Sequence, residues 1–269
     1  MTEGLVAGIC ARVRLQYHHA LAQLAAVEKG EDIEALHRYR VSLRKSRCLL
    51  DLFIEQLWQT PACAMSASMA QQARVTNRLR DIDVFVHSLE QNDLQIHLLQ
   101  LRKQEQQQML VQLKQLEREQ LLCQALLGLK WPRNEMLLTE CVSMVSEGLR
   151  QSIVNRCEVA LASNKSKHWH KVRLLIKKQR YLADLCLPQG RSGHAQEWQD
   201  RLGQFNDSCT QLTLLHSLTE LTPNLEVRID GHVERLQQLK QSQKCALVQL
   251  CQQELAKKDP FGLLVEKNR

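Results

Sequence analysis

The chain has 269 residues, which is enough for one large domain or two modest ones. Glycine (10 residues), proline (5) and aromatic residues (4%) are scarce, and the composition favours helices over strands. It therefore excludes a strand-rich fold and predicts an all-α protein. The formal net charge is +7, and no apolar run approaches the roughly 18 residues of a membrane span, so no membrane partner is expected.

Turn-forming residues such as Gly30 and Pro61 divide the chain into long amphipathic segments. We predict helices at residues 4–28, 33–58, 62–90, 94–127, 134–162, 166–187, 194–218 and 225–257. One domain is expected over residues 1–257, with halves at about 1–127 and 134–257, and the tail 258–269 is expected to be irregular.

The N-terminus and the cysteines indicate the compartment. Glu3 stands where a secretion signal would carry basic residues, so a cytoplasmic location is expected. The ten cysteines show no CxxC motif and no paired Cys/His spacing. They are therefore predicted to be reduced thiols, and we expect no metal and no cofactor.

Positive charge is concentrated in two short windows that contain no acid. Residues 37–47 hold five basic residues and residues 165–180 hold seven. Without those twelve, 24 basic residues remain against all 29 acids. A surface that only confers solubility would intersperse both signs, so this segregation indicates a polyanionic ligand.

The second window has helical spacing. At about 100° per residue, four of its basic side chains fall within an arc of roughly 80° on a helix. The apolar residues Val172, Leu175 and Ile176 lie outside that arc. The pattern predicts a helix with a cationic stripe formed by His170, Arg173, Lys177 and Arg180.

The two basic windows form an internal repeat. HRYRVSLRKSR (37–47) and HKVRLLIKKQR (170–180) share histidine at the first position, basic residues at the second, eighth and ninth, and arginine at the fourth and eleventh. Each is followed by a turn-like motif with aspartate, NRLRDIDVF (77–85) and LGQFNDSCTQL (202–212). The repetition predicts two related halves.

These four motifs resemble those of the CHAD domain, the conserved histidine α-helical domain, over roughly residues 1–255. The resemblance implies two four-helix bundles related by an internal pseudo-twofold repeat, with a basic cavity or channel that binds inorganic polyphosphate. Many relatives carry a CYTH domain as well; this sequence has no room for one, so a standalone unit is expected. Asn77, Leu79 and Gln179 depart from the usual pattern but leave the charged positions intact.

The expected role is a non-enzymatic polyphosphate-binding module that gathers with polyphosphate granules. Arginine can donate two N–H groups to phosphate oxygens, and lysine acts as a mobile point charge. The predicted polyphosphate contacts are His37, Arg40, Arg44, Lys45, Arg47, Arg80, His170, Arg173, Lys177, Lys178 and Arg180. Supporting side chains, which orient these groups or cap helices, are predicted to be Asp81, Asp83, Asn206, Asp207 and Tyr181.

Two alternatives stay open from the residues alone. Asp81, Asp83 and Asp207 could serve a metal-dependent phosphohydrolase, although no histidine of metal-ligand spacing accompanies them. The basic surface could also bind nucleic acid in general. Nucleic acid is disfavoured because Trp169 and Tyr181 stand beside apolar residues, which indicates core packing rather than base stacking. Protein partners are not predicted.

Overall fold

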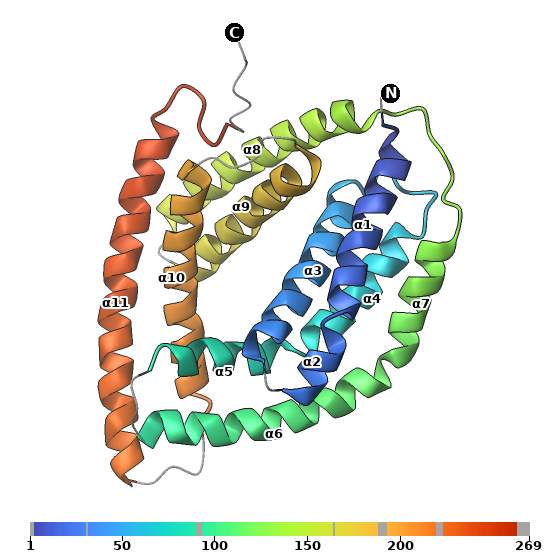
Figure 1. The fold of residues 1–269 in the computed structure, drawn as a ribbon. Helices are drawn as coiled ribbons and strands as arrows, with labels where there is room; N and C mark the ends of the chain where they lie inside the picture. Colours follow the sequence, from blue (N-terminus) through green and yellow to red (C-terminus); the bar gives the residue numbers. More distant parts are fainter. Residues whose placement is uncertain are drawn as a thin grey trace. The chain divides into compact units, whose positions relative to one another are not determined.

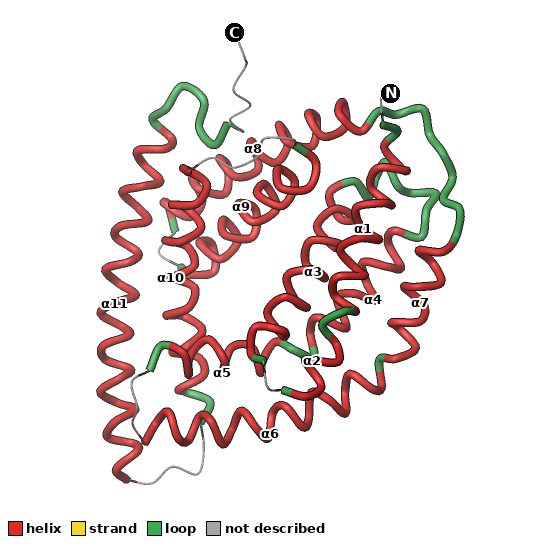
Figure 2. The backbone as a smooth tube through the Cα atoms, viewed as in Figure 1, coloured by secondary structure: helices red, strands yellow, loops and turns green. Residues whose placement is uncertain are grey.

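The computed structural model describes residues 3–30, 32–89, 93–163, 165–187, 193–218 and 223–262. Within these ranges the chain forms helices and loops, and the only strand-like pairing is an isolated bridge between Gly4 and Leu137 (Figures 1 and 2). The all-α prediction is confirmed. No disulfide joins the cysteines of these ranges.

Several predicted helices are shorter or interrupted. The segment predicted at 33–58 ends at Leu52, and the predicted helices 4–28, 62–90 and 94–127 each contain a break. The helices are α1 (Leu5–Leu21), α2 (Leu24–Lys29), α3 (Ile33–Leu52), α4 (Ala62–Arg74), α5 (Asn77–His87), α6 (Asp93–Gln115), α7 (Glu117–Gly128), α8 (Leu138–Ala162), α9 (Ser166–Cys186), α10 (Gly193–Leu215) and α11 (Pro223–Leu255).

The start of α3, the first basic helix, is defined by two local signals. Gly30 ends α2 in the left-handed region, at φ 71°, which glycine adopts without the steric cost of a Cβ. Asp32 then caps α3, because its carboxylate accepts a hydrogen bond from the Glu34 N–H at 2.8 Å. The helix therefore begins just before the first basic window.

The chain packs into two compact units, Met1–His87 with His97–Val145, and Ser88–Ile96 with Ser146–Arg269. One boundary between the units falls inside α6 and another inside α8, whereas the halves were predicted to join at about 127–134. The predicted domain limits and the pseudo-twofold repeat stay predictions.

In the first unit, α3 packs against α1, α2 and α4, and α4 packs against α7 (Figure 1). The apolar faces of these helices bury Ile9, Leu43 and Leu49 completely. Each such side chain contributes about 1.5–3 kcal/mol by leaving water. One face of α3 is thereby fixed in the core, and the other carries its basic residues.

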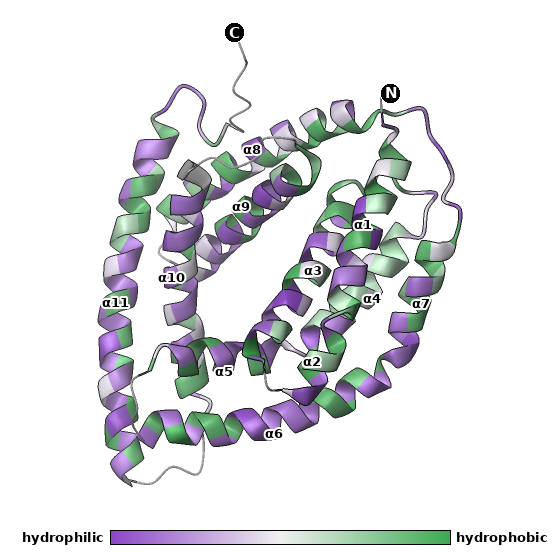
Figure 3. Ribbon diagram, in the orientation of Figure 1, coloured by the Kyte–Doolittle hydropathy of each residue, from purple (hydrophilic) through white to green (hydrophobic). Residues whose placement is uncertain are grey.

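In the second unit, α10 packs between α9 and α11 (Figure 1). Green and purple alternate along these helices in Figure 3, as expected of amphipathic helices with one apolar face. Trp169, Val172 and Ile176 of α9 are at most 3% exposed. Val172 and Ile176, which lie outside the cationic stripe, thus anchor α9 together with Trp169.

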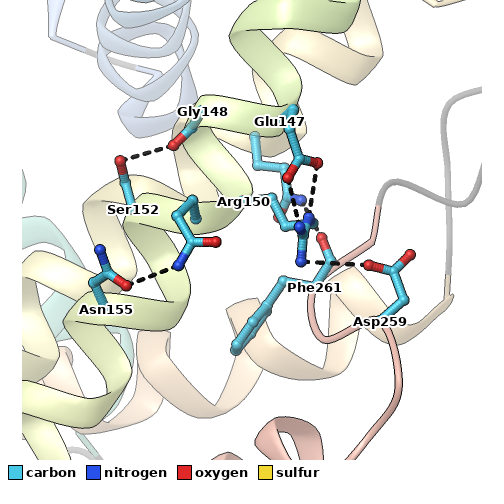
Figure 4. A network of polar contacts seen from close by, with 9 residues as sticks. Glu147, Gly148, Arg150, Ser152, Asn155, Asp259 and Phe261 are labelled. Carbon is cyan, nitrogen blue, oxygen red and sulfur yellow. Dashed lines mark hydrogen bonds and ion pairs between the residues drawn. The ribbon is translucent and has the colours of Figure 1, made fainter.

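A C-terminal clamp, which we define as residues 259–261, holds the end of the second unit (Figure 4). The ring of Phe261 lies against Trp198, with 5.0 Å between the ring centroids. The backbone of Phe261 makes two hydrogen bonds: its carbonyl accepts one from Gln179 Nε2 at 2.8 Å, and its N–H donates one to Glu254 at 2.9 Å. Asp259 pairs with Arg150 at 3.4 Å. The described part of the predicted irregular tail contains no helix, but Phe261 within it packs against Trp198. Residues 263–269 lie outside the described ranges.

Candidate polyanion-binding helices

The first basic row lies on α3 and consists of His37, Arg40, Arg44, Lys45 and Arg47, all partly buried. A long basic side chain can cover apolar surface with its stem while its charged end stays near water. Partial burial limits the conformations of these side chains. The row therefore offers charges whose positions are partly fixed before a ligand arrives.

Arg40 of this row is held in place by two hydrogen bonds. Its guanidinium donates hydrogen bonds to the carbonyl of Ala73 at 3.0 Å and to the hydroxyl of Thr76, at the end of α4. Burial, with the repulsion of Arg44 next, lowers the pKa of Arg40 to about 10, so the side chain stays charged at neutral pH. Arg40 thus connects α3 to the α4–α5 turn besides adding charge.

The RDIDV motif lies inside α5, and its charged side chains have separate surroundings. Arg80 pairs with Glu34 at 3.6 Å. The exposed Asp81 lies close enough to raise the pKa of Arg40, against the larger effect of burial. Because Asp81 is an interior residue of α5, it does not cap that helix.

Asp83 is buried in the first unit and forms an ion pair with Arg102 of α6, with 2.6 Å between Oδ1 and Nε. Burial raises the pKa of Asp83, and the hydrogen bond from Arg102 opposes that shift. Arg102 was not predicted as a partner of Asp83, because it lies in a glutamine-rich helix without a motif. The pair joins α5 to α6 within the core.

The second basic row lies on α9. His170 is exposed, whereas Arg173, Lys177, Lys178 and Arg180 are partly buried. Arg180 donates a hydrogen bond to Gln199 of α10 and lies over the ring of Tyr181, 4.9 Å from its centroid. A cation over an aromatic face is attracted by the ring quadrupole. Tyr181 thus helps to hold the last arginine of the row.

His170 contacts Asn206, the asparagine of the predicted LGxxND motif, with 3.0 Å between Nδ1 and Oδ1. The Asn206 amide nitrogen donates to Thr210 at 3.4 Å, which orients its oxygen toward the histidine. A carbonyl oxygen only accepts, so Nδ1 carries the proton, and Nε2 is the atom that can meet a ligand. Asp207 lies inside α10 like Asn206, so it does not cap that helix either.

The start of α9 holds further positive charge that the predicted site did not include. Burial lowers the pKa of His168, and Lys167, Lys171, Arg156 and Lys165 lower it further. Arg156 belongs to α8 and lies outside both acid-free windows. Its position in the sequence therefore does not show that it lies near His168, and only the fold does.

Among the described residues, no group of three or more His, Cys, Asp and Glu side chains could hold a metal ion. Over the same ranges, none of the helices combines the length and the apolar character that a membrane span requires.

The fold resembles two solved structures. One is the crystal structure of the CHAD domain from the plant Ricinus communis, with a TM-score of 0.79 and 19% sequence identity over 96% of this chain and 94% of that chain. The other is PptA from Streptomyces chartreusis, with a TM-score of 0.63 and 15% identity over 93% of this chain and 100% of that one. No curated protein sequence matches. The family model for the CHAD domain matches residues 11–216, most of the chain, and the chain therefore belongs to the CHAD domain family.

Proposed function

We propose that this protein binds inorganic polyphosphate through the basic rows of α3 and α9 and that it acts as a binding module rather than an enzyme. The observation that carries the proposal is the partial burial of every arginine and lysine of the two basic rows, which lie in windows without acids. In each unit the basic helix is anchored by its apolar face. Membership of the CHAD family supports inorganic polyphosphate as the ligand.

The spacing of the rows suits a strand of phosphates. Side chains three and four residues apart on a helix have Cβ atoms about 5–6 Å apart, so neighbouring basic groups can contact successive phosphates. Partial burial also reduces the conformational entropy that each side chain loses when it binds. The binding free energy is then expected to come from several charge-assisted hydrogen bonds.

A binding role is also supported by the surroundings of the candidate catalytic acids. A metal-dependent hydrolase would need ionised carboxylates gathered around a cation. Asp83 is instead buried and already paired with Arg102. Incubation with polyphosphate and Mg²⁺ or Mn²⁺ tests whether the protein is a hydrolase. We expect no phosphate release; release that is lost in Asp83→Ala, with circular dichroism showing that the variant keeps its fold, would establish the hydrolase instead.

Inorganic polyphosphate is favoured over nucleic acid by the burial of the aromatic residues near the α9 row. Single-stranded nucleic acids are bound by stacking of bases on accessible aromatic faces. Trp169 is 0% exposed and Tyr181 is 2% exposed, so neither offers such a face. We therefore propose association with polyphosphate granules in the cell, where the polymer is concentrated.

Retardation of labelled long-chain polyphosphate in a gel tests the proposed function. We expect the protein to retard polyphosphate, and RNA of equal total charge to compete poorly at physiological salt. Arg44→Gln should weaken retardation, whereas the matched control Arg118→Gln, an exposed residue of α7, should leave it unchanged. Equal competition by RNA would contradict the assignment to polyphosphate.

A further inference from the structure

A pocket of about 190 Å³ lies between α9 and α10, entirely within the second unit. Its charged side comes from Lys167 and Arg173 of α9 together with His170, and its apolar back comes from Leu202 and Phe205 of α10. His170 and Arg173 belong to the α9 row, so the pocket adjoins one end of that row. Here the charges lie beside a buried apolar wall, which distinguishes this end from the rest of the row.

The pocket is suited to an anion. No aspartate or glutamate is among the described residues that line it, and two of the lining residues carry permanent positive charge. Ser166 and Lys167, which also line the pocket, form the first turn of α9, where none of the described side chains caps the helix. The N–H groups of such a turn add partial positive charge at the same place.

The size and the back wall of the pocket suit the end of a chain. A volume of about 190 Å³ is below the roughly 300–1,000 Å³ of pockets that enclose drug-sized ligands, and it is too little for a long strand. Leu202 and Phe205 are at most 2% exposed, and Trp169, also in the lining, is fully buried. Because this wall offers no charge to a second phosphate, an entering chain would terminate there.

We infer that this pocket binds a terminal phosphoryl group, the doubly ionised end of a phosphate chain or of a phosphomonoester. The inference rests on the proposed function and names the part of the ligand that this site recognises. A terminal phosphoryl group carries up to about two negative charges near neutral pH, against a single ionised oxygen on an internal phosphate. His170, held through Nδ1 by Asn206, lines the same pocket.

Linear tripolyphosphate and cyclic trimetaphosphate test the inference by calorimetry, because both contain three phosphates but only the linear form has ends. We expect tripolyphosphate to bind at least about tenfold more tightly, the effect of one further hydrogen bond between charged groups. Phenyl phosphate, a phosphomonoester, distinguishes the two ligands that carry a terminal phosphoryl group, a phosphate chain and a phosphomonoester. Binding as tight as that of tripolyphosphate assigns the pocket to phosphoryl ends in general, and weaker binding assigns it to chain ends.

Asn206→Asp provides the matching variant, because it adds a negative charge to the pocket without changing the size of the side chain. We expect it to weaken tripolyphosphate binding by about tenfold or more, while long-chain polyphosphate loses much less because the open rows still bind it. Gln204→Glu, an exposed position on the same helix, makes the same change in charge outside the pocket and should have little effect. Unchanged circular dichroism and melting of both variants establish that the fold is kept.

Two results would overturn the inference and leave the proposed function standing. One is equal affinity for tripolyphosphate and trimetaphosphate; the other is equal weakening by Asn206→Asp and Gln204→Glu, in both cases with long chains still bound. Failure to bind long-chain polyphosphate would overturn the proposed function. The comparison of linear with cyclic triphosphate would still decide what the pocket binds.

Discussion

The basic helices α3 and α9 share a sequence pattern but use it differently in their own units. Arg40, the fourth residue of the first motif, donates hydrogen bonds to the end of α4. Arg173, at the same position of the second motif, lines a pocket. The first histidine, His37, is partly buried, whereas the second, His170, is exposed and held by Asn206. Equivalent motif positions thus differ in how much of their charge stabilises the fold and how much is presented to a ligand.

The largest expected effect on stability concerns the second unit, whose end is held by the clamp. Phe261→Ala should lower the free energy of unfolding by about 3 kcal/mol, because it removes a buried ring and leaves a cavity beside Trp198. Hydrogen exchange should show the largest loss of protection in α9, α10 and α11. Equal loss of protection in α3 would show that the clamp does not act on the second unit in particular.

A smaller effect should separate the structural arginine of α3 from its neighbour. Arg40→Met should destabilise the protein by about 2 kcal/mol, because the carbonyl of Ala73 and the hydroxyl of Thr76 lose a charged donor. Arg44→Met should change stability by less than about 0.5 kcal/mol, as for most partly exposed positions. Urea unfolding of the two variants measures both values. Equal destabilisation would contradict a special structural role for Arg40.

The smallest effect is a proton linkage expected at the start of α9. The pKa of His168 is lowered by burial and by the lysines and Arg156 around it, so the unfolded chain binds a proton more readily than the folded one. This contribution to stability is therefore present above the ordinary histidine pKa of about 6.5 and falls as pH decreases below it. Ala35 stands at the equivalent position before α3's motif, so the first unit has no histidine at this position.

Bound polyphosphate should reverse the shift, because its negative charge offsets the neighbouring cations and raises the pKa of His168. A titration of the histidine resonances by nuclear magnetic resonance, with His168→Gln for assignment, measures the pKa with and without polyphosphate. A pKa that stays unchanged on binding would place the polymer away from this end of α9.

The helical class and the basic rows were predictable from the sequence, because both depend on local spacing and composition. The breaks near Ala22, Val75 and Leu116 were not, since no glycine or proline marks them and the packing of neighbouring helices decides where a helix bends. The long-range pairings of Arg40 with Ala73 and of Asp83 with Arg102 were also missed. Nothing in a single sequence states which distant residues come together.

His170 and Asn206 were both predicted site residues, because both belong to motifs of the internal repeat. The sequence did not predict that the two side chains contact each other. The clamp shows the opposite case. Its sequence, DPF, was predicted to be part of an irregular tail. The clamp has a structural role only through the contacts that Phe261 makes with Trp198, Gln179 and Glu254. A short segment whose interactions are all distant carries no periodic pattern to identify it.

The salt dependence of polyphosphate affinity tests most directly whether both basic rows contribute to binding. Each phosphate contact on a single-stranded polyanion contributes about 0.7 to the slope of log affinity against log salt, so removing two charges should reduce the slope by about 1.4. We predict this reduction for Lys177→Gln with Arg180→Gln, and a similar one for Arg44→Gln with Arg47→Gln. If one pair of substitutions abolishes the slope and the other leaves it unchanged, a single helix binds the polymer and the account of two contributing rows is wrong.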